Sequence, residues 1–337
     1  MSTAVRVRIL IVAVVALAAV ATAYTLYAAG RTDARDKPRP GGPVVVQGTV
    51  DLTGRGRVLF RNMAFGPQRD HLASVPLDGI GGPRTVASLS CQKFHASAGT
   101  AVCAQADRGA VTTFSILILD SRMRELRRYK AVGGPSRARV SPSGRMAAWT
   151  VFVSGESYAG IDFSTRTAIL DTRTWTLHDN LEKYRILKDG EPYRSVDVNF
   201  WGVTFVDDDL FYATLATKGK TYLVRGNVSA RTVRTLRENV ECPSLSPDGT
   251  RIAFKHRVKG AMSAMPWRLH VLDLRTMKET ATAETRPLDD QVTWLDDRTL
   301  LYALPAEFET DQYKVPADGT GAPALVMKGA QTPVILR

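Results

Sequence analysis

The stretch Leu245-Ser-Pro-Asp-Gly-Thr-Arg-Ile-Ala-Phe254 is the sharpest local pattern in this 337-residue chain. It predicts a strand, a tight turn and a second strand. Pro247 presets φ to about −65° at the second turn position, and Gly249 can adopt the left-handed conformation that closes a hairpin. The β-branched and aromatic residues after the turn favour pairing back on residues 242–245. One such hairpin is marginally stable in water, so its recurrence decides the fold.

The hairpin recurs in phase with a second pattern, a strand that ends in Asp at a turn. Its closest copy is Val140-Ser-Pro-Ser-Gly-Arg-Met-Ala-Ala-Trp149. The strand-ending turns, 42 to 56 residues apart, centre on Asp78, Asp120, Asp171, Asn227, Asp273 and Asp318. Six units follow, roughly 48–87, 88–132, 133–190, 191–239, 240–285 and 286–337. No long amphipathic helical pattern appears after residue 43. The sequence therefore predicts an all-β, six-bladed β-propeller of four-stranded blades.

Closure of the ring requires a strand from one terminus. Residues Pro333–Leu336 follow the last unit as an apolar strand, and the first unit has a weak first strand of its own. We expect Pro333–Leu336 to complete the first blade and remove an open edge. The competing candidate is Val44–Val46.

The N-terminus carries an export signal. Residues 9–29 are almost continuously apolar and follow Arg6 and Arg8. Their length suits a membrane-spanning helix, which predicts an uncleaved signal-anchor in residues 1–30. The small-x-small sequence Ala21-Thr22-Ala23 leaves a cleaved signal peptide as the alternative. Residues 31–47, rich in Pro, Gly and charge, predict a flexible stalk before the propeller of residues 48–337. The propeller is then outside a cell membrane that the chain crosses once, or it is secreted.

The charge balance narrows the partners. The formal net charge is +12 and the pI is about 9.8, whereas 44% apolar and 23% charged residues are ordinary for a globular protein. Export removes nucleic acid as the natural partner and leaves an anionic cell-wall polymer, lipid headgroups or another envelope protein. A solvated basic surface that serves solubility is the other interpretation. We expect a monomeric propeller.

Three cysteines stand at positions 91, 103 and 242. Cys91 and Cys103 flank a predicted turn between adjacent strands, and an exported chain permits a disulfide. A Cys91–Cys103 disulfide is the prediction, with two buried free thiols as the alternative. Cys242 is expected to be a small buried residue at the start of a strand.

The repeats carry a family resemblance. Residues 245–254, Ser141-Pro-Ser-Gly144 and Ala317-Asp-Gly-Thr-Gly-Ala-Pro323 resemble the repeats of TolB-like β-propeller proteins, whose propeller domain has six blades. The resemblance covers about residues 48–337. The N-terminal segment and Asn199-Phe-Trp-Gly-Val-Thr-Phe205 look like the exported or membrane-anchored members from high-GC Gram-positive bacteria.

The catalytic and metal-binding patterns of the sequence are weak, which favours a protein without catalytic residues, metal or cofactor. Gly155-Glu-Ser157-Tyr-Ala-Gly160 has one residue too many for a nucleophile elbow, and a polar loop is the better interpretation. The five histidines are scattered over four units, away from metal-ligand spacing. Asp207-Asp208-Asp209 reads as a charged hairpin turn, since it lacks the pattern of a calcium loop.

The remaining candidate is the central funnel, which first strands line. Polar and aromatic residues of three of these strands predict a ligand site there, and the candidates are Arg139, Arg194, Asp197, Asn199, Trp201 and Trp294. The competing interpretation is that such aromatic residues pack between blades.

Two functions remain in view. The first is a non-catalytic module that binds an envelope protein or polymer. The alternative is a funnel-mouth lyase or glycosidase, which needs two carboxylates, or one with Arg or Tyr, in one cavity. Asp197 and Asp290 are the carboxylates that the sequence places near the funnel.

Overall fold

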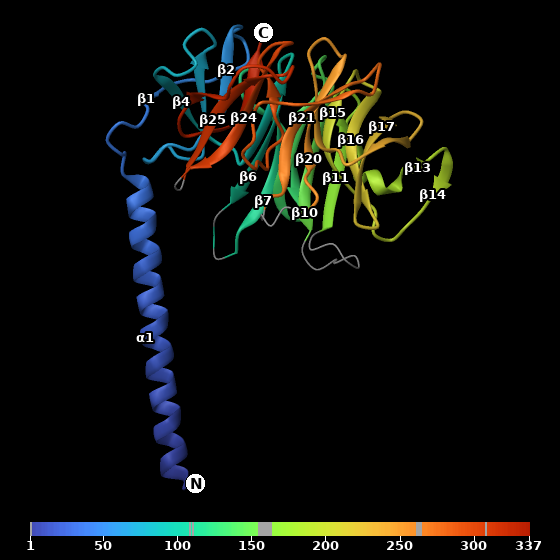
Figure 1. Cartoon of the computed structure of the whole chain (residues 1–337). Coiled ribbons are helices and arrows are strands. Elements are labelled where there is room, and N and C mark those ends of the chain that lie inside the picture. Colours follow the sequence, from blue (N-terminus) through green and yellow to red (C-terminus); the bar gives the residue numbers. More distant parts are fainter. Residues whose placement is uncertain (1, 108, 110, 154–163, 261–264, 307–308) are drawn as a thin grey trace.

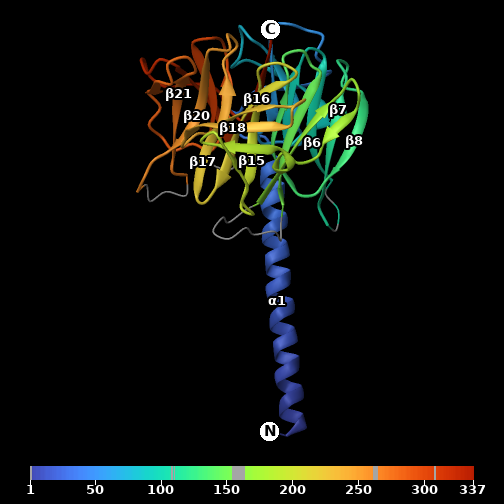
Figure 2. The ribbon, with the colours of Figure 1, turned by 90° about the vertical axis from the view of Figure 1, so that its right-hand side faces the viewer.

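The computed structural model describes residues 2–107, 109, 111–153, 164–260, 265–306 and 309–337. A long N-terminal helix is followed by six β-sheets arranged as a ring (Figures 1 and 2). The four main strands of each sheet pair antiparallel, and the first strands of neighbouring sheets contact one another around the centre. The predicted six-bladed propeller of four-stranded blades is confirmed.

The blades follow the order of the predicted units. Blade 1 contains β27 (Ala330–Leu336), β2 (Arg57–Asn62), β3 (His71–Pro76), β4 (Arg84–Ser90) and, at its outer edge, β1 (Val45–Gln47). Blade 2 contains β5 (Lys93–Ser97), β6 (Thr100–Asp107), β7 (Thr113–Leu119) and β8 (Glu125–Ala131). Blade 3 contains β9 (Gly134–Val140), β10 (Met146–Val153), β11 (Ser164–Asp171) and β12 (Thr176–His178).

The second half of the ring is irregular in one place. Blade 4 contains β15 (Asn199–Phe205), β16 (Leu210–Thr217), β17 (Lys220–Asn227) and β18 (Thr232–Glu238), extended by β13 (Arg185–Lys188) and β14 (Glu191–Tyr193). Blade 5 contains β19 (Glu241–Leu245), β20 (Arg251–Arg257), β21 (Trp267–Asp273) and β22 (Glu279–Ala281). Blade 6 contains β23 (Thr293–Trp294), β24 (Thr299–Ala306), β25 (Glu309–Pro316) and β26 (Ala324–Met327).

The hydrophobic core is divided among the six contacts between neighbouring blades. Because side chains alternate between the two faces of a strand, each sheet presents one apolar face to each neighbour. Phe60 and Met327 meet between blades 1 and 6, for example, and Leu59 and Phe94 meet between blades 1 and 2. Packing between blades therefore holds the ring together.

The Ser-Pro-Asp-Gly hairpin has the predicted geometry. It joins β19 to β20, and Gly249 has φ +70°. Burial alone would raise the pKa of Asp248, but hydrogen bonds from Ser246 and Thr250 bring it below its usual value. The backbone N–H of Asp248 also donates to Asp297 of blade 6 at 3.0 Å. The turn thus stabilises both its own hairpin and the contact with the next blade.

The acidic turn 207–209 has an equivalent structural role. Asp208 accepts a hydrogen bond from Ser141 of blade 3 at 2.8 Å. Asp207 accepts from the backbone N–H groups of Asp209 and Leu210 at 2.7 and 2.6 Å. These contacts are those of a hydrogen-bonded turn that links two blades.

The C-terminus closes the ring as predicted. Strand β27 pairs antiparallel with β2 from Arg57↔Leu336 to Asn62↔Ala330. The competing segment forms β1, which pairs in parallel with β4 at the opposite edge of blade 1. Both candidates thus join the first blade, and the C-terminal strand is the inner one.

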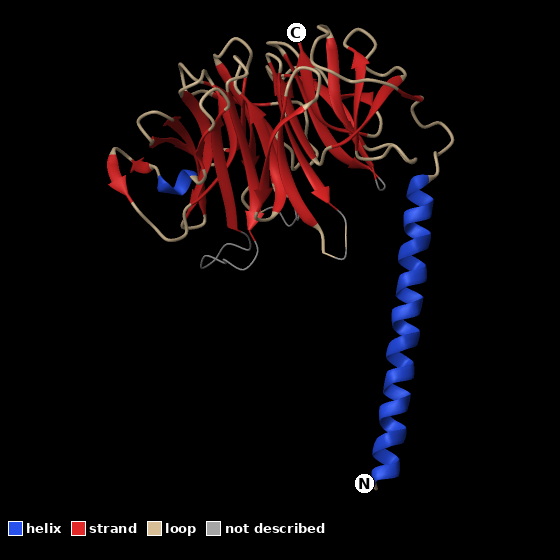
Figure 3. Ribbon diagram, turned by 180° about the vertical axis from the view of Figure 1, so that it is seen from behind, coloured by secondary structure: helices blue, strands red, loops and turns tan. Residues whose placement is uncertain are grey.

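The N-terminal helix α1 (Thr3–Asp36) extends away from one end of the propeller (Figure 3). Its segment Thr3–Gly30 is long and apolar enough to cross a bilayer, with a mean hydropathy of 2.5 and no buried side chains in that window. Residues 31–36, within the predicted stalk, continue the helix. The carbonyl of Arg35 accepts a hydrogen bond from Gly66 N at 2.9 Å, and the Arg39 guanidinium lies 3.8 Å from the centre of the Phe65 ring. Both contacted residues belong to the β2–β3 connection, residues 63–70. We call the end of the propeller at which this connection lies the α1 end.

The long third unit supplies the extension of blade 4. After β12, the chain forms a short 3-10 helix η1 (Leu181–Lys183) and then β13, which pairs in parallel with β18. Strand β14 pairs antiparallel with β13 before the chain enters β15. The extension covers the outer edge of blade 4.

The cysteines are as predicted. Cys91 and Cys103 form a disulfide with a Cα–Cα distance of 5.4 Å, and Cys242 is a buried free thiol. The bond joins the segment before β5 to β6 in blade 2.

Candidate functional site

A small basic cavity lies at the centre of the ring, among the innermost strands. It is lined by β5, β9 and β27 and by the residues around the start of β23. Its charged side chains are Lys93, Arg137, Arg139 and Asp290. The cavity volume is about 30 Å³, which admits a few atoms of a ligand but not a whole sugar ring. We call this the central cavity.

Arg137 is the best anchored cation of the central cavity. Its guanidinium donates to the Ser136 carbonyl at 2.8 Å and to the Cys242 Sγ at 3.3 Å. It also lies 3.6 Å from a carboxylate oxygen of Asp289. Asp289 in turn contacts the buried ammonium of Lys255 at 2.5 Å. The negative charge of Asp289 is therefore shared between two cations.

Arg139 and Lys93 carry positive charge that Asp290 alone offsets only in part. The Nε of Arg139 is buried without a hydrogen-bond partner, and within the described residues neither side chain forms an ion pair. Burial lowers the pKa of Arg139 to about 10. Burial and the nearby Arg137 lower the pKa of Lys93 to about 8. A negative group entering the central cavity would relieve this electrostatic strain.

Asp290 and His95 complete the surroundings. Asp290 accepts hydrogen bonds from the backbone N–H groups of Gln291 and Ala303 at 2.9 and 3.1 Å, while burial raises its pKa. His95 accepts a hydrogen bond from Val140 N through Nδ1, and burial beside Arg139 keeps its pKa well below the usual value. His95 is thus neutral and helps to hold β5 against β9.

Arg139 alone among the six predicted funnel residues lines the central cavity. Asn199 is fully buried, and its amide oxygen accepts from Thr165 N at 2.8 Å. Trp201 packs with Ala216 and Cys242 where blades 4 and 5 meet. These two side chains therefore join blades.

The other three predicted residues also lie elsewhere. Arg194 is exposed in the connection from β14 to β15. Asp197 accepts hydrogen bonds from Ser195 and Thr217 and from the backbone of Lys218. Trp294 donates from its indole N–H to the Ser244 carbonyl at 2.9 Å, between blades 5 and 6.

Two cavity cations were not among the predicted site residues. Arg137 belongs to the same strand as Arg139, two residues away, so both point to the same side. Lys93 begins β5, at the position where β9 and β27 also face the centre. A charged residue at the start of a predicted first strand was the available signal, but Lys93 is the only lysine or arginine in the stretch 85–107.

The structure brings together two histidines that are 14 positions apart. The Nδ1 atoms of His256 and His270 lie 2.6 and 2.5 Å from the same oxygen of Glu279. The Asn239 amide, oriented by two hydrogen bonds with the Arg257 backbone, donates to Nε2 of His256 and so places the imidazole proton on Nδ1. That proton occupies the position that a metal would need. The cluster therefore suits close contacts of both imidazoles with the Glu279 carboxylate rather than a metal centre.

The central cavity offers binding chemistry more readily than acid–base chemistry by paired carboxylates. Asp290 lines it, whereas Asp197 is bound to the β16–β17 turn and is not among the lining residues. A glycosidase needs both carboxyl groups on one cavity. The elbow-like Ser157 segment lies outside the described residues.

Comparisons with known proteins identify the fold. No family model matches the sequence, and no curated protein matches it. Among solved structures, TolB from Acinetobacter baumannii is 17% identical, with a TM-score of 0.55 over 85% of this chain and 67% of that one. A puromycin-hydrolyzing peptidase from Mycobacterium tuberculosis is 13% identical, with a TM-score of 0.48 over 82% of this chain and 45% of that one.

A third structure, an oligogalacturonate lyase in complex with manganese, is 13% identical, with a TM-score of 0.45 over 81% of this chain and 77% of that one. At these identities the likeness concerns the fold. The structure has six blades built on four strands each, is closed by the C-terminal strand and is similar to TolB. The chain has the fold of a TolB-like six-bladed β-propeller.

Proposed function

We propose that the protein is a non-catalytic binding module of the cell envelope, held at the membrane by α1, whose central cavity takes a negative group of an anionic cell-wall polymer. The positive charge of Lys93 and Arg139, which have no ion-pair partner among the described residues and share one carboxylate, Asp290, supports this proposal. A half-buried cation without an ion-pair partner is costly, and an anionic ligand supplies the missing interaction. The small volume means that one charged group enters while the rest of the polymer stays outside.

The helix supports an envelope location. Side chains such as Leu10, Leu17 and Leu26 are 64%, 70% and 69% exposed. A helix of this length with so much exposed apolar surface is unfavourable in water and favourable in a bilayer. The direct contacts of Arg35 and Arg39 with the β2–β3 connection keep the propeller close to the end of the helix. We expect a single-pass protein with the propeller outside the cell and the α1 end toward the bilayer.

Membrane extraction and external protease test the topology. The full chain should resist alkaline carbonate extraction, and protease added to intact cells without their wall should degrade the propeller. Release of a mature chain that begins after Ala23 would support the secreted alternative instead.

Polymer binding tests the cavity. In isothermal titration of the full chain, poly(glycerol phosphate) should bind, and Lys93→Gln should weaken this binding about tenfold because one half-buried cation of the cavity is lost. Lys130→Gln, at an exposed position of β8, provides the matched control. Equal affinities of Lys93→Gln and the wild type would contradict the cavity site. Capture of a single envelope protein instead of polymer would favour the protein-binding form of the proposal.

One observation favours the alternative of a lyase. Lys93, with its pKa at about 8, is a potential proton acceptor beside Arg137 and Arg139, which could neutralise a substrate carboxylate. Incubation with acidic polysaccharides, followed by the ultraviolet absorbance of an unsaturated product, separates the two functions. Turnover that Lys93→Gln abolishes would replace the binding module by an enzyme.

A further inference from the structure

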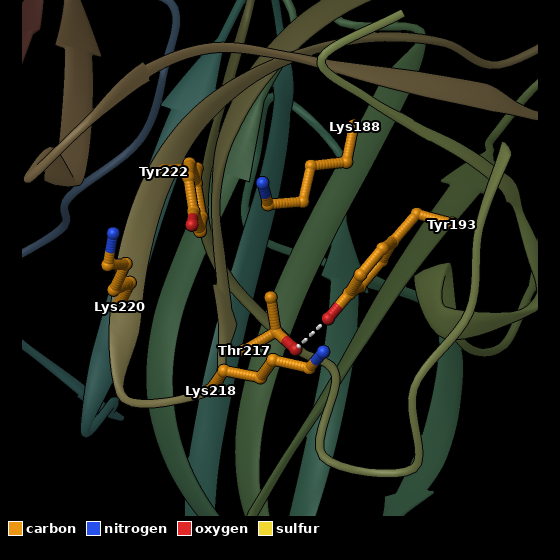
Figure 4. A pocket seen from close by; sticks show the side chains of 6 residues that line it. All are labelled: Lys188, Tyr193, Thr217, Lys218, Lys220 and Tyr222. Atoms are coloured by element: carbon orange, nitrogen blue, oxygen red, sulfur yellow. Dashed lines mark hydrogen bonds between the residues drawn. The ribbon is translucent and has the colours of Figure 1, made fainter. Parts of the chain in front are cut away.

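A second basic pocket lies on blade 4, and Figure 4 shows the side chains that line it. It lies beside the β16–β17 turn, which joins the second and third strands of its blade, as the β2–β3 connection at the α1 end does. We define the lysine–tyrosine pocket by the residues that line it, Lys188, Tyr193, Thr217, Lys218, Lys220 and Tyr222. Its volume is about 250 Å³. The extension strands β13 and β14 provide one wall, and the β16–β17 hairpin provides the other. Because it depends on the irregular extension, the pocket is not part of the repeated blade design.

The walls combine aromatic rings with ammonium groups. Figure 4 shows Lys188 reaching into the space between the two tyrosines. Its Nζ lies 5.1 Å from the centre of the Tyr222 ring, and the Nζ of Lys218 lies 5.9 Å from that of Tyr193. The hydroxyl groups of Tyr193 and Thr217 are hydrogen-bonded at 2.8 Å. This bond joins the extension to the hairpin and fixes the separation of the two walls.

Asp197 holds the β16–β17 turn in place. Its carboxylate accepts hydrogen bonds from Thr217 Oγ1 at 2.7 Å and from the backbone N–H of Lys218 at 2.5 Å. Lys218 and Gly219 both have left-handed backbones, with φ of +49° and +70°. The turn therefore presents the Lys218 side chain from a fixed backbone, which lowers the entropy cost of binding a ligand.

The pocket carries positive charge that solvent-exposed carboxylates only partly offset. Lys188 contacts Asp189 at 2.5 Å and Lys220 contacts Glu238 at 3.0 Å, but these carboxylates are 75% and 54% exposed. Ion pairs of this kind contribute about 0 to 1 kcal/mol, so a ligand anion competes with them readily. Within the described part of the chain, the Lys218 ammonium has no carboxylate partner.

The choice of cation indicates the anion. The chain contains 33 arginines and 12 lysines, yet the pocket is lined by three lysines and no arginine. Arginine binds carboxylates and phosphates alike through a flat, bidentate fork, whereas lysine acts as a point charge with three rotatable donors, an arrangement that also binds the oxygens of a phosphate. The tyrosine rings add apolar surface for a ring-shaped body. A volume just below that of drug-sized sites limits this body to about one ring.

We propose that the lysine–tyrosine pocket binds a sugar or polyol ring that carries a phosphate ester. The phosphate lies among Lys188, Lys218 and Lys220, and the ring lies against Tyr193 and Tyr222. Its position at the α1 end places the pocket where the headgroup of a membrane lipid could supply this group, as could a phosphorylated glycan unit. The pocket shares no lining residue with the central cavity, so ligand binding at either site can be tested independently of the other.

Calorimetry on the full chain in phosphatidylcholine nanodiscs tests the proposal. Glucose 1-phosphate should bind more tightly than either glucose or inorganic phosphate, because only the ester uses both the lysines and the tyrosines. The double variant Lys188→Gln/Lys218→Gln should weaken it at least tenfold, and added salt should weaken the wild-type interaction. Lys130→Gln is the control for loss of a lysine outside the pocket.

Four results would overturn the proposal: no binding of glucose 1-phosphate, equal binding of inorganic phosphate, unchanged affinity in the double variant, or loss of binding in Lys93→Gln instead. Should the double variant unfold, Lys218→Gln alone should weaken binding several-fold, because its turn is held by backbone bonds. Nanodiscs that contain phosphatidylinositol distinguish the sources. Competition with glucose 1-phosphate would identify a lipid headgroup, and its absence a soluble phosphorylated glycan.

Discussion

Closure of the ring by β27 makes two apolar side chains of the C-terminus decisive for stability. Val334 and Leu336 are 3% and 8% exposed, and both pack in the cluster between blades 1 and 2. Replacing a buried Leu by Ala costs about 2 to 5 kcal/mol. Since Leu336 lies at the end of the strand, we expect about 2 to 3 kcal/mol for Leu336→Ala and somewhat less for Val334→Ala. Together these losses approach the lower end of the 5 to 15 kcal/mol that typically stabilises a domain.

Urea unfolding followed by tryptophan fluorescence measures the effect. The urea midpoint of Leu336→Ala should be lower than that of the wild type at an unchanged slope, and the midpoint of Val334→Ala/Leu336→Ala should be lower still. Leu325→Ala, at a 45% exposed position of β26, is the matched control and should change stability by less than about 0.5 kcal/mol. Deletion of residues 332–337 should lower the midpoint most, because it also exposes the edge of β2. An unchanged midpoint in Leu336→Ala would refute closure by β27.

Three further predictions concern single contacts. Gly202→Ala should lower the free energy of unfolding by about 2 to 3 kcal/mol, because the Gly202 backbone has φ +67° and a Cβ there would lie 2.8 Å from the Cα of Cys242. Gly190→Ala, at φ +89° but with open space around the new Cβ, should cost less in the same urea unfolding assay. Asp171→Asn should lower the free energy of unfolding by about 1 to 2 kcal/mol at pH 7, because the hydrogen-bonded Arg145 holds the pKa of Asp171 at about 2 in the folded protein. The difference between variant and wild type should shrink as the pH falls from about 4 through 2, because the wild-type carboxylate then also loses its charge. Cys91→Ser/Cys103→Ser should lower stability by about 2 to 4 kcal/mol, and reductant should lower the wild-type midpoint but not that of the variant.

The repeated part of the fold could be predicted from the sequence because its signals are local. Turn residues such as Pro247 and Gly249 act within four positions, and the spacing of the Asp turns counts the blades. Closure was also predictable, since an apolar strand without a unit of its own remained at the C-terminus. The extension of blade 4 was not predictable, because β13 pairs with β18, 47 residues later in the chain.

The residues of the central cavity were harder to predict, because contacts between distant parts of the chain decide which side chains face it. A polar residue on a first strand can face the centre or the neighbouring blade, and one residue of register decides which. Arg139 faces the central cavity, whereas Asn199 contacts blade 3 and Trp201 packs where blades 4 and 5 meet. His256 and His270 meet through pairing of β20 with β21, a contact that no short spacing reveals.

The affinity for poly(glycerol phosphate) of two Arg139 variants tests the proposed function most directly. Arg139→Lys keeps the positive charge at the central cavity, and Arg139→Glu reverses it. Isothermal titration at low salt should give nearly wild-type affinity for Arg139→Lys and a loss of at least a hundredfold for Arg139→Glu, because repulsion replaces attraction in a buried site. Equal affinities of the two variants, with both folded as judged by their denaturation midpoints, would contradict a binding module that works through the central cavity.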